Sequence, residues 1–338
     1  MAHEAPAVVY GAAGLAAFSD EQIVEIFSIL DQHNVKEIDT ARLYGPSEAI
    51  LGKHDAPKRY TIHTKALGFQ PGAMGKQAVL DSISTSLENL GVEQVRGRNF
   101  PRARVVLTFQ VDIFYLHSPD PKTPIEETLS AVREIYAAGK FKRFGLSNFR
   151  PDAVQEVYDI QTKANSVLPS VFQGNYNAVA RHIESDLFPL LRKLKISFYA
   201  YSPIAGGFLV KESQQLRDQS VPGRFGANSQ IGDMYIKMYT KPSLLEALDE
   251  WGVIAKDAGI SKAALAYRWI AYHSALKASC GDAIIIGASR PEQVEETLSY
   301  IKAGPLDAEI AGRASGLWTQ IEKDAPIDNW TSHSSLKA

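Results

Sequence analysis

The sequence contains almost no cysteine and no long apolar run. Cys280 is the single cysteine among 338 residues, so an internal disulfide is excluded and a cysteine-based metal site is disfavoured. No stretch of 18 apolar residues occurs, and the N-terminal segment lacks the basic flank and apolar core of a signal peptide. These absences predict a soluble protein of a reducing compartment, the cytoplasm, without a membrane partner.

An excess of charge of one sign is also missing. The chain carries 36 Lys and Arg against 38 Asp and Glu, a formal net charge of -2, and both signs are mixed along it. No basic field is present to bind nucleic acid, and no acidic block indicates a disordered tail. With 45% hydrophobic residues, the chain can bury a large core. Its length suits either one large α/β barrel or two ordinary domains.

Short apolar segments alternate with segments of helical period along the whole chain. Segments such as "VKEID", "YTIHTKA", "VDIFYLH" and "RFGLSN" read as strands, and eight such strands occur in order. Strands alternating with helices are typical of βαβ units and a parallel sheet. No G-x-G-x-x-G motif follows the first strand, which removes the main support for a doubly wound dinucleotide-binding sheet. The sequence therefore favours a closed (β/α)₈ barrel, formed as a single domain by residues 1–338.

Polar residues recur where the predicted strands end. In a barrel these ends open on one face, and active sites form there from the βα loops. Any one of these residues alone could be an ordinary polar strand end. Six of them at equivalent positions predict an active site, and they are Asp39, Lys65, His117, Asn148, Gln173 and Ser202.

Several short motifs surround these residues. They are "DTARLYG", the Lys of "IHTKA", the His of "FYLHSPD", "GLSNF", "FQGNYNA", "AYSPIAGG", "PGRF" and "IIIGASRPEQVEE". Each motif is short, and the specific feature is their order along the chain. Together they resemble the aldo-keto reductase superfamily over nearly the full length, in particular the branch of aflatoxin-aldehyde and succinic-semialdehyde reductases. The resemblance implies a TIM barrel, the cofactor NADPH, and reduction of aldehydes or ketones to alcohols.

By matching motif positions, the resemblance implies that Asp39, Tyr44, Lys65 and His117 are the catalytic residues. Hydride transfer to a carbonyl carbon leaves an alkoxide that needs a proton, and a phenol suits this role if its pKa falls from about 10. Lys65 beside Tyr44 would favour the phenolate, and Asp39 would keep Lys65 charged. His117 would hydrogen-bond the carbonyl oxygen. For Asp39 and Lys65 taken alone, a structural ion pair is the alternative interpretation.

The same resemblance assigns contacts with the cofactor. Ser147, Asn148 and Gln173 match the ligands of the nicotinamide carboxamide, a group that needs both donors and acceptors. Tyr201 matches the residue whose ring stacks on the nicotinamide. Small residues follow in "SPIAGG", where the backbone can approach a pyrophosphate closely. The residues predicted to contact it are Ser202, Pro203, Ala205 and Gly206.

Further residues match the part of the site that binds the adenosine end of NADPH. Arg224 in "PGRF", with Ser289 and Arg290, would bind the 2′-phosphate, for which a guanidinium group is well suited. A solvated loop arginine is the alternative interpretation of Arg224. Gln293 and Glu296 match the residues on the adenine side. NADPH is therefore the predicted cofactor.

Two classes of function remain open at this stage. The first is an NADPH-dependent reductase whose partner is a small carbonyl substrate. The alternative is a regulatory or redox-sensing subunit of the potassium-channel β type, which has this fold and cofactor and acts through a partner protein. The related branch also suggests a homodimer.

One segment departs from the family pattern. Residues 95–110, "VRGRNFPRARVVLTFQ", contain four arginines and no acidic residue. Related reductases run almost directly from the preceding helix into the fourth strand. Excising this segment gives "LGVEQVDIFYLH", which restores an ordinary short connection. Two hypotheses explain the insert, namely a retained intron and a genuine lineage-specific loop.

Overall fold

The computed structural model describes residues 4–92, 110–218, 225 and 230–334. Arg224 and nearly all of the predicted insert, residues 95–109, lie outside the described residues. The chain divides into two compact units. One contains residues 9–172 and 287–291, and the other contains residues 173–286 and 292–338 with the N-terminal segment up to Val8.

Eight strands close into a barrel in the order of the sequence. The recorded pairings β1–β2, β2–β3, β3–β4, β4–β5 and β7–β8 are all parallel. The predicted (β/α)₈ barrel is therefore confirmed, and each predicted apolar segment overlaps one strand. The strands are β1 (Ala7–Gly11), β2 (Glu37–Asp39), β3 (Thr61–Lys65), β4 (Val111–Leu116), β5 (Phe141–Ser147), β6 (Pro169–Asn175), β7 (Ser197–Tyr201) and β8 (Ala283–Ile286).

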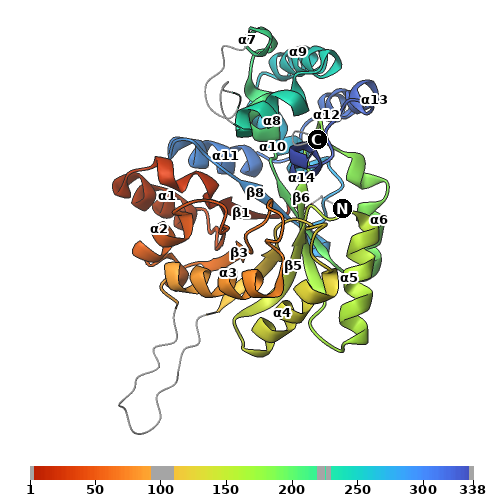
Figure 1. The fold of residues 1–338 in the computed structure, drawn as a ribbon. Coiled ribbons are helices and arrows are strands. Elements are labelled where there is room, and N and C mark those ends of the chain that lie inside the picture. The colour runs from red at the N-terminus through yellow and green to blue at the C-terminus, as the bar shows by residue number, and fades with distance from the viewer. Residues whose placement is uncertain (1–3, 93–109, 219–224, 226–229, 335–338) are drawn as a thin grey trace. The chain divides into compact units, whose positions relative to one another are not determined.

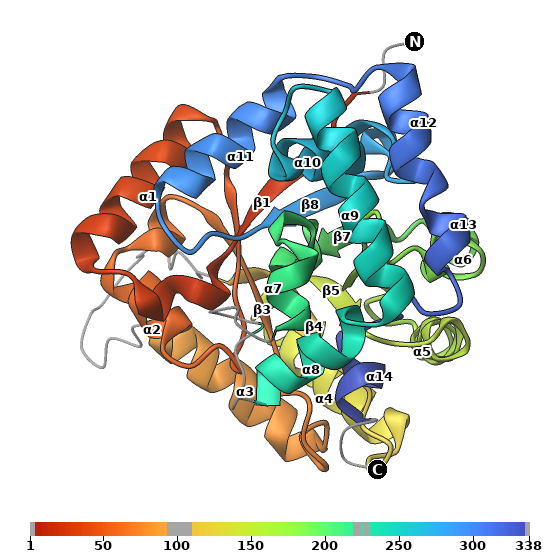
Figure 2. The same cartoon turned by 90° about the horizontal axis from the view of Figure 1, so that it is seen from above.

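Helices follow the strands along the chain, and Figures 1 and 2 show α1, α2 and α3 on the outer side of β1 and β3. Within the described residues, none of the helices is long and apolar enough to cross a membrane. The helices are α1 (Asp20–Gln32), α2 (Ser47–Lys53), α3 (Lys76–Asn89), α4 (Ile125–Ala137), α5 (Pro151–Lys163), α6 (Leu187–Leu194), α7 (Ser213–Arg217), α8 (Gln230–Tyr239), α9 (Pro242–Asp257), α10 (Lys262–Tyr272), α11 (Glu292–Lys302), α12 (Ala308–Gly316), α13 (Trp318–Ile321) and α14 (Asn329–Ser334). Short 3₁₀ turns are η1 (Ala12–Ala17), η2 (Ala56–Lys58), η3 (His182–Glu184), η4 (Ala205–Val210) and η6 (Ala278–Cys280).

Local sequence explains where these helices begin and end. Ser19 precedes α1, and its hydroxyl accepts the amide N–H of Gln22 while the Gln22 side chain accepts that of Ser19. This reciprocal pair satisfies two donors that the first turn leaves open. After the C-terminal end of α4, Gly139 has a φ of 67°. Glycine adopts this left-handed conformation without strain, and it ends the helix.

Alternation along β3 separates the residues that face the barrel interior from those that face the helices. Lys65 hydrogen-bonds to Asp39 of the neighbouring strand β2, whereas Thr64 hydrogen-bonds to Glu48 of α2. Successive side chains of a strand point to opposite faces. The parallel register aligns Lys65 with Tyr115 of β4. Lys65 is thus held inside the barrel at the C-terminal end of its strand.

Candidate active site at the carboxyl ends of β2 to β5

Lys65 is the most deeply buried charged group of the site. Its side chain is fully inaccessible, and its Nζ donates hydrogen bonds to Asp39 Oδ2 at 2.6 Å and to the Thr40 carbonyl at 2.8 Å. Burial alone would lower the pKa of Lys65, but the charge of Asp39 and the interaction with Tyr44 outweigh burial and raise it. Lys65 therefore carries a positive charge inside the barrel.

Tyr44 lies in the loop between β2 and α2, beside this ammonium group. Lys65 Nζ is 5.0 Å from the centroid of the Tyr44 ring. The loop is held by the amide of Tyr44, which donates to the Ala41 carbonyl, and by the amide of Ser47, which donates to the Tyr44 carbonyl. Tyr44 remains partly exposed. A partly exposed tyrosine therefore borders a cation that solvent cannot reach.

His117 follows β4 and packs edge-on against Tyr44, with the ring centroids 5.8 Å apart. Burial and the nearby charge of Lys65 hold the pKa of His117 well below 6.5, although the Ala66 carbonyl opposes them. The imidazole is therefore neutral near pH 7, with one N–H donor. Asn148 Nδ2 donates to the His117 carbonyl at 2.9 Å, which fixes the backbone at this position.

The sequence predicted that Asp39, Tyr44, Lys65 and His117 act together, and the structure brings these side chains together within one compact unit. The arrangement combines a partly exposed tyrosine, a buried cation and a neutral imidazole. Such a set can donate a proton and a hydrogen bond to one oxygen atom. Within the described part of the chain, His, Cys, Asp and Glu form no cluster suited to a metal ion.

Sequence reasoning missed Phe69, which follows β3 and borders His117. Its ring centroid lies 5.2 Å from that of His117 with the planes nearly perpendicular. The Phe69 backbone is left-handed, with a φ of 64°, an unusual conformation for a bulky residue. Its amide donates to the Ser118 hydroxyl at 2.9 Å. An aromatic residue directly after Gly68 was the available signal, but the backbone conformation was not visible in it.

His63 lies one layer deeper in the barrel than Lys65 and is fully buried. Its Nε2 is 3.1 Å from Glu37 Oε2 and 3.7 Å from Asp112 Oδ2. Arg143 donates to the same Asp112 carboxylate. The His63 ring is therefore part of a cluster of charged side chains below the active site, with Glu37, Asp112 and Arg143.

Ser147 and Asn148, predicted to bind the cofactor carboxamide, lie at the C-terminal end of β5 in the unit that holds Lys65 and Tyr44. Both are buried, and Asn148 Nδ2 donates to Ser147 Oγ at 3.0 Å. The Asn148 backbone is left-handed, with a φ of 63°. Ser289 and Arg290, predicted to bind the 2′-phosphate, lie exposed in the loop between β8 and α11.

The remaining described candidates belong to the other unit. Gln173 is buried within β6, and Tyr201 ends β7, where its hydroxyl accepts the amide N–H of Asn329 at 3.4 Å. After Tyr201 the chain takes left-handed conformations at Ser202, Ala205 and two glycines. The other predicted residues are Pro203, which is buried, Gly206 with a φ of 65°, and Gln293 and Glu296, which are half-buried on α11.

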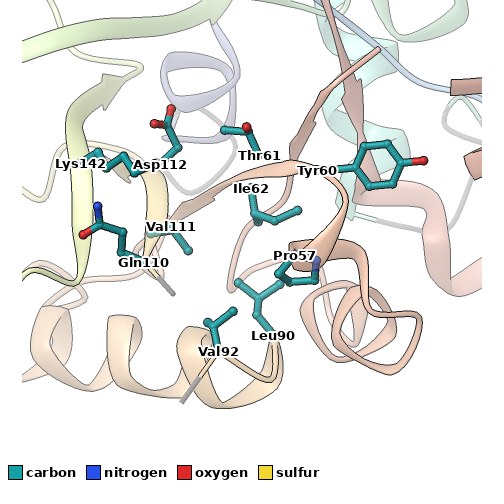
Figure 3. Close-up of a pocket in the computed structure, with 10 residues that line it drawn as sticks. All are labelled: Pro57, Tyr60, Thr61, Ile62, Leu90, Val92, Gln110, Val111, Asp112 and Lys142. Carbon is teal, nitrogen blue, oxygen red and sulfur yellow. The ribbon is translucent and has the colours of Figure 1, made fainter. Parts of the chain in front are cut away.

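A cavity of about 250 Å³ lies elsewhere in the first unit (Figure 3). It opens beside Thr61 and Val111, the first residues of β3 and β4. Lys65 and His117 are at the opposite ends of these strands, so the cavity is not the candidate active site. Its lining residues are Pro57, Tyr60, Thr61, Ile62, Leu90, Val92, Gln110, Val111, Asp112 and Lys142.

Comparison with known proteins agrees with this geometry. The model of the aldo/keto reductase family matches residues 7–96 and 103–318. The interruption of this match falls within the predicted insert, residues 95–110.

Individual relatives are similar over most of their length. Oxidoreductase sirO of Leptosphaeria maculans is 37% identical over 336 residues, which are 96% of this chain and 97% of that protein. An aldo-keto reductase of Pseudocercospora fijiensis is 35% identical over 87% of this chain and 96% of its own length. Human aflatoxin B1 aldehyde reductase member 2 is 35% identical over 86% of this chain and 80% of its own length. The chain therefore belongs to the aldo/keto reductase family and is an oxidoreductase that acts on carbonyl groups.

Proposed function

We propose that this protein reduces aldehydes or ketones to alcohols with NADPH, and that Tyr44 is the proton donor. One observation carries the proposal. The partly exposed Tyr44 places its ring beside the buried Lys65–Asp39 ion pair. A tyrosine used for packing alone has no need of a buried cation beside it.

The ion pair prepares Tyr44 for proton transfer. The positive charge of Lys65 favours the phenolate and thereby brings the pKa of the hydroxyl closer to the working pH. Asp39 offsets the cost of burying the ammonium and holds it in place, with a contact of 2.6 Å. The phenol can then give its proton to the oxygen that becomes the alcohol.

His117 orients the substrate in this proposal. Because its imidazole is neutral, its N–H can donate a hydrogen bond to the carbonyl oxygen without competing for the proton. Such a donor polarises the carbonyl and stabilises negative charge that develops on the oxygen. Since the pKa of His117 lies well below 6.5, its titration causes no loss of rate near neutral pH.

The chemistry of the residues present fits NADPH. When bound, the cofactor supplies the hydride. Asn148 and Gln173 offer amide groups and Ser147 a hydroxyl, which match the donors and acceptors of a carboxamide. The left-handed turn contains Gly206, and a glycine has no side chain to hinder close approach of a pyrophosphate to the backbone.

The names of the relatives support an aldehyde substrate. Several of them, from human, rat and mouse, are aflatoxin B1 aldehyde reductases at 34–35% identity. The test is NADPH oxidation, followed by absorbance, with 4-nitrobenzaldehyde and a panel of other aldehydes and ketones, each with NADPH and NADH in parallel. We expect turnover with NADPH. NADPH binding without turnover of any carbonyl compound would contradict the proposal and support the regulatory alternative.

Arg224→Ala should raise the KM for NADPH far more than the KM for NADH. Only NADPH carries the 2′-phosphate, and a charge-assisted hydrogen bond contributes about 1.5–3 kcal/mol. The preference for NADPH should therefore fall by about one to two orders of magnitude. Arg217→Ala is the control, because Arg217 is an exposed arginine of α7 paired with Asp249. An equal loss with both cofactors would place Arg224 in a structural role.

Deletion of residues 95–110 should leave kcat/KM within a few-fold of the full-length value. The deletion joins the segment after α3 to β4 at the N-terminal ends of the strands, away from Lys65 and His117. Changing the length of a connection changes its closure entropy only slightly, so stability should be equal or higher. A deletion variant that misfolds or loses reductase activity contradicts this expectation. Sequencing of the transcript separates the intron hypothesis from the loop hypothesis.

A further inference from the structure

Glu48 is a fully buried carboxylate that the proposed chemistry does not use. It lies in the first turn of α2, four residues after Tyr44, and its side chain has no exposed surface. Thr64 Oγ1 donates to Glu48 Oε1 at 2.6 Å, and Arg42 Nη1 donates to Oε2 at 3.1 Å. A buried carboxylate without such partners would strongly destabilise the fold. These two partners, Thr64 and Arg42, belong to β3 and to the loop between β2 and α2.

Both hydrogen-bond partners of Glu48 are close in sequence to a residue of the active site. Thr64 immediately precedes Lys65 on β3 and faces α2, while Lys65 faces the barrel interior. Arg42 stands two residues before Tyr44, and its amide donates to the Lys65 carbonyl at 3.3 Å. The Glu48 carboxylate therefore joins the strand that carries the ammonium to the loop that carries the phenol.

A second set of contacts fixes the start of α2 itself. Ser47 Oγ donates to the Ala12 carbonyl at 2.9 Å and lies 2.9 Å from Thr40 Oγ1. Thr40 in turn accepts a hydrogen bond from Lys65 through its carbonyl. The helix that presents Glu48 is thus anchored to η1 and to the end of β2. A carboxylate on such a fixed support can set the position of what it binds.

We propose that Glu48 is a positioning residue for the reduction, and that its carboxylate holds the Tyr44 loop against β3 so that the phenol stays beside Lys65. This inference rests on the function proposed above. Asp39 acts on Lys65 from inside the barrel, and Glu48 acts on the same strand from the outer side. The placement of Tyr44 then depends on both contacts.

The proposal makes a different prediction from a purely structural role. If the loop loosens, Tyr44 spends less time beside Lys65, and proton transfer slows while the groups proposed to bind NADPH remain in place. We therefore expect kcat to fall and the KM for NADPH to stay unchanged. The pKa of the Tyr44 hydroxyl should also rise, because the phenol is no longer held beside the cation. The loss of reduction rate that accompanies deprotonation of Tyr44 should therefore occur at a higher pH than in the wild type. A purely structural Glu48 would change stability alone.

The first variant is Glu48→Gln, which keeps the shape of the side chain and an oxygen acceptor for Thr64. Its amide group meets the guanidinium of Arg42 as a second donor, so this contact is lost. We expect kcat to fall about ten- to a hundredfold, the range for a small displacement of a reacting group. The double variant Arg42→Gln/Glu48→Gln restores a donor and an acceptor at this contact and should recover part of kcat.

The matched control is Asp282→Asn. Asp282 is also a fully buried carboxylate paired with an arginine, Arg192, but it precedes β8 at the N-terminal end of that strand. This variant should lower the melting temperature and leave kcat and the pH profile of the folded enzyme unchanged.

Thr64→Val and Arg42→Gln each remove one hydrogen bond to Glu48. These variants replace Glu48→Gln in the experiment if Glu48→Gln does not fold. Folded variants of this set that keep the kcat and the pH profile of the wild type would overturn the inference. That result leaves the proposed function intact, provided that the wild type reduces aldehydes. A wild type without reductase activity would instead refute the proposed function, and with it the role assigned to Glu48.

Discussion

Tyr44→Phe is expected to lower kcat for aldehyde reduction at least about a hundredfold, the usual scale for loss of a general acid. The ring remains, so its contacts with His117 and with the Lys65 ammonium are kept. Only the hydroxyl is removed. The KM for NADPH should therefore change by no more than a few-fold. Steady-state kinetics with 4-nitrobenzaldehyde, together with a fluorescence titration of NADPH, measures both quantities.

Tyr60→Phe is the matched control for this experiment. Tyr60 lies just before β3, at the opposite end of that strand from Lys65, and the single proton of its hydroxyl is shared between the Phe27 carbonyl and Asp31, each 3.0 Å away. Removing this hydroxyl should lower stability slightly and leave kcat unchanged. A Tyr44→Phe enzyme that reduces aldehydes at nearly the wild-type rate would mean that another group supplies the proton.

The fold was predictable because each strand carries its own signal. Segments such as "VDIFYLH" are short, apolar and bounded by polar turns, and β4 (Val111–Leu116) falls inside that segment. The first and last residues of the strands were predicted less accurately. The predicted segment "RFGLSN" begins two residues after the true start of β5 at Phe141, because the charged Lys142 interrupts the apolar pattern there.

The site was predictable to different degrees. Asp39, Lys65 and His117 could be placed together from topology, since polar residues at the ends of parallel neighbouring strands face one opening. Tyr44 lies in a loop, where no periodicity acts, and only the resemblance to a family singled it out. Its distance from Lys65 became known from the structure.

Glu48 could not be predicted at all. An acidic residue in the first turn of a helix is favourable on the surface, because it interacts with the helix dipole. Sequence therefore gives no reason to expect that this carboxylate is buried. Its burial results from the packing of α2 against β3, which brings Thr64 and Arg42 to it. Tertiary contacts of this kind are set by side chains that are distant in sequence.

Lys65→Met is expected to have a similarly large effect on catalysis, together with a loss of stability. Methionine fills a comparable volume but removes the cation beside Tyr44. The phenol is then a weaker acid, so kcat should fall by about a hundredfold or more, and the fall of the rate at high pH should move to higher pH. Steady-state kinetics across pH measures both effects.

The stability effect of this substitution can be separated from the catalytic one. The variant leaves the buried Asp39 carboxyl without the ammonium, and removal of one partner of a buried ion pair costs about 3–5 kcal/mol. Lys65→Met/Asp39→Asn should therefore be more stable than Lys65→Met and equally slow. Because the pKa of Lys65 is raised, its contribution to stability is fully present below its ordinary pKa and is lost as pH rises through the raised value. The free energies of unfolding of wild type and variant should converge at strongly alkaline pH. A double variant that recovers turnover would show that the charge of Lys65 does not serve the proton transfer.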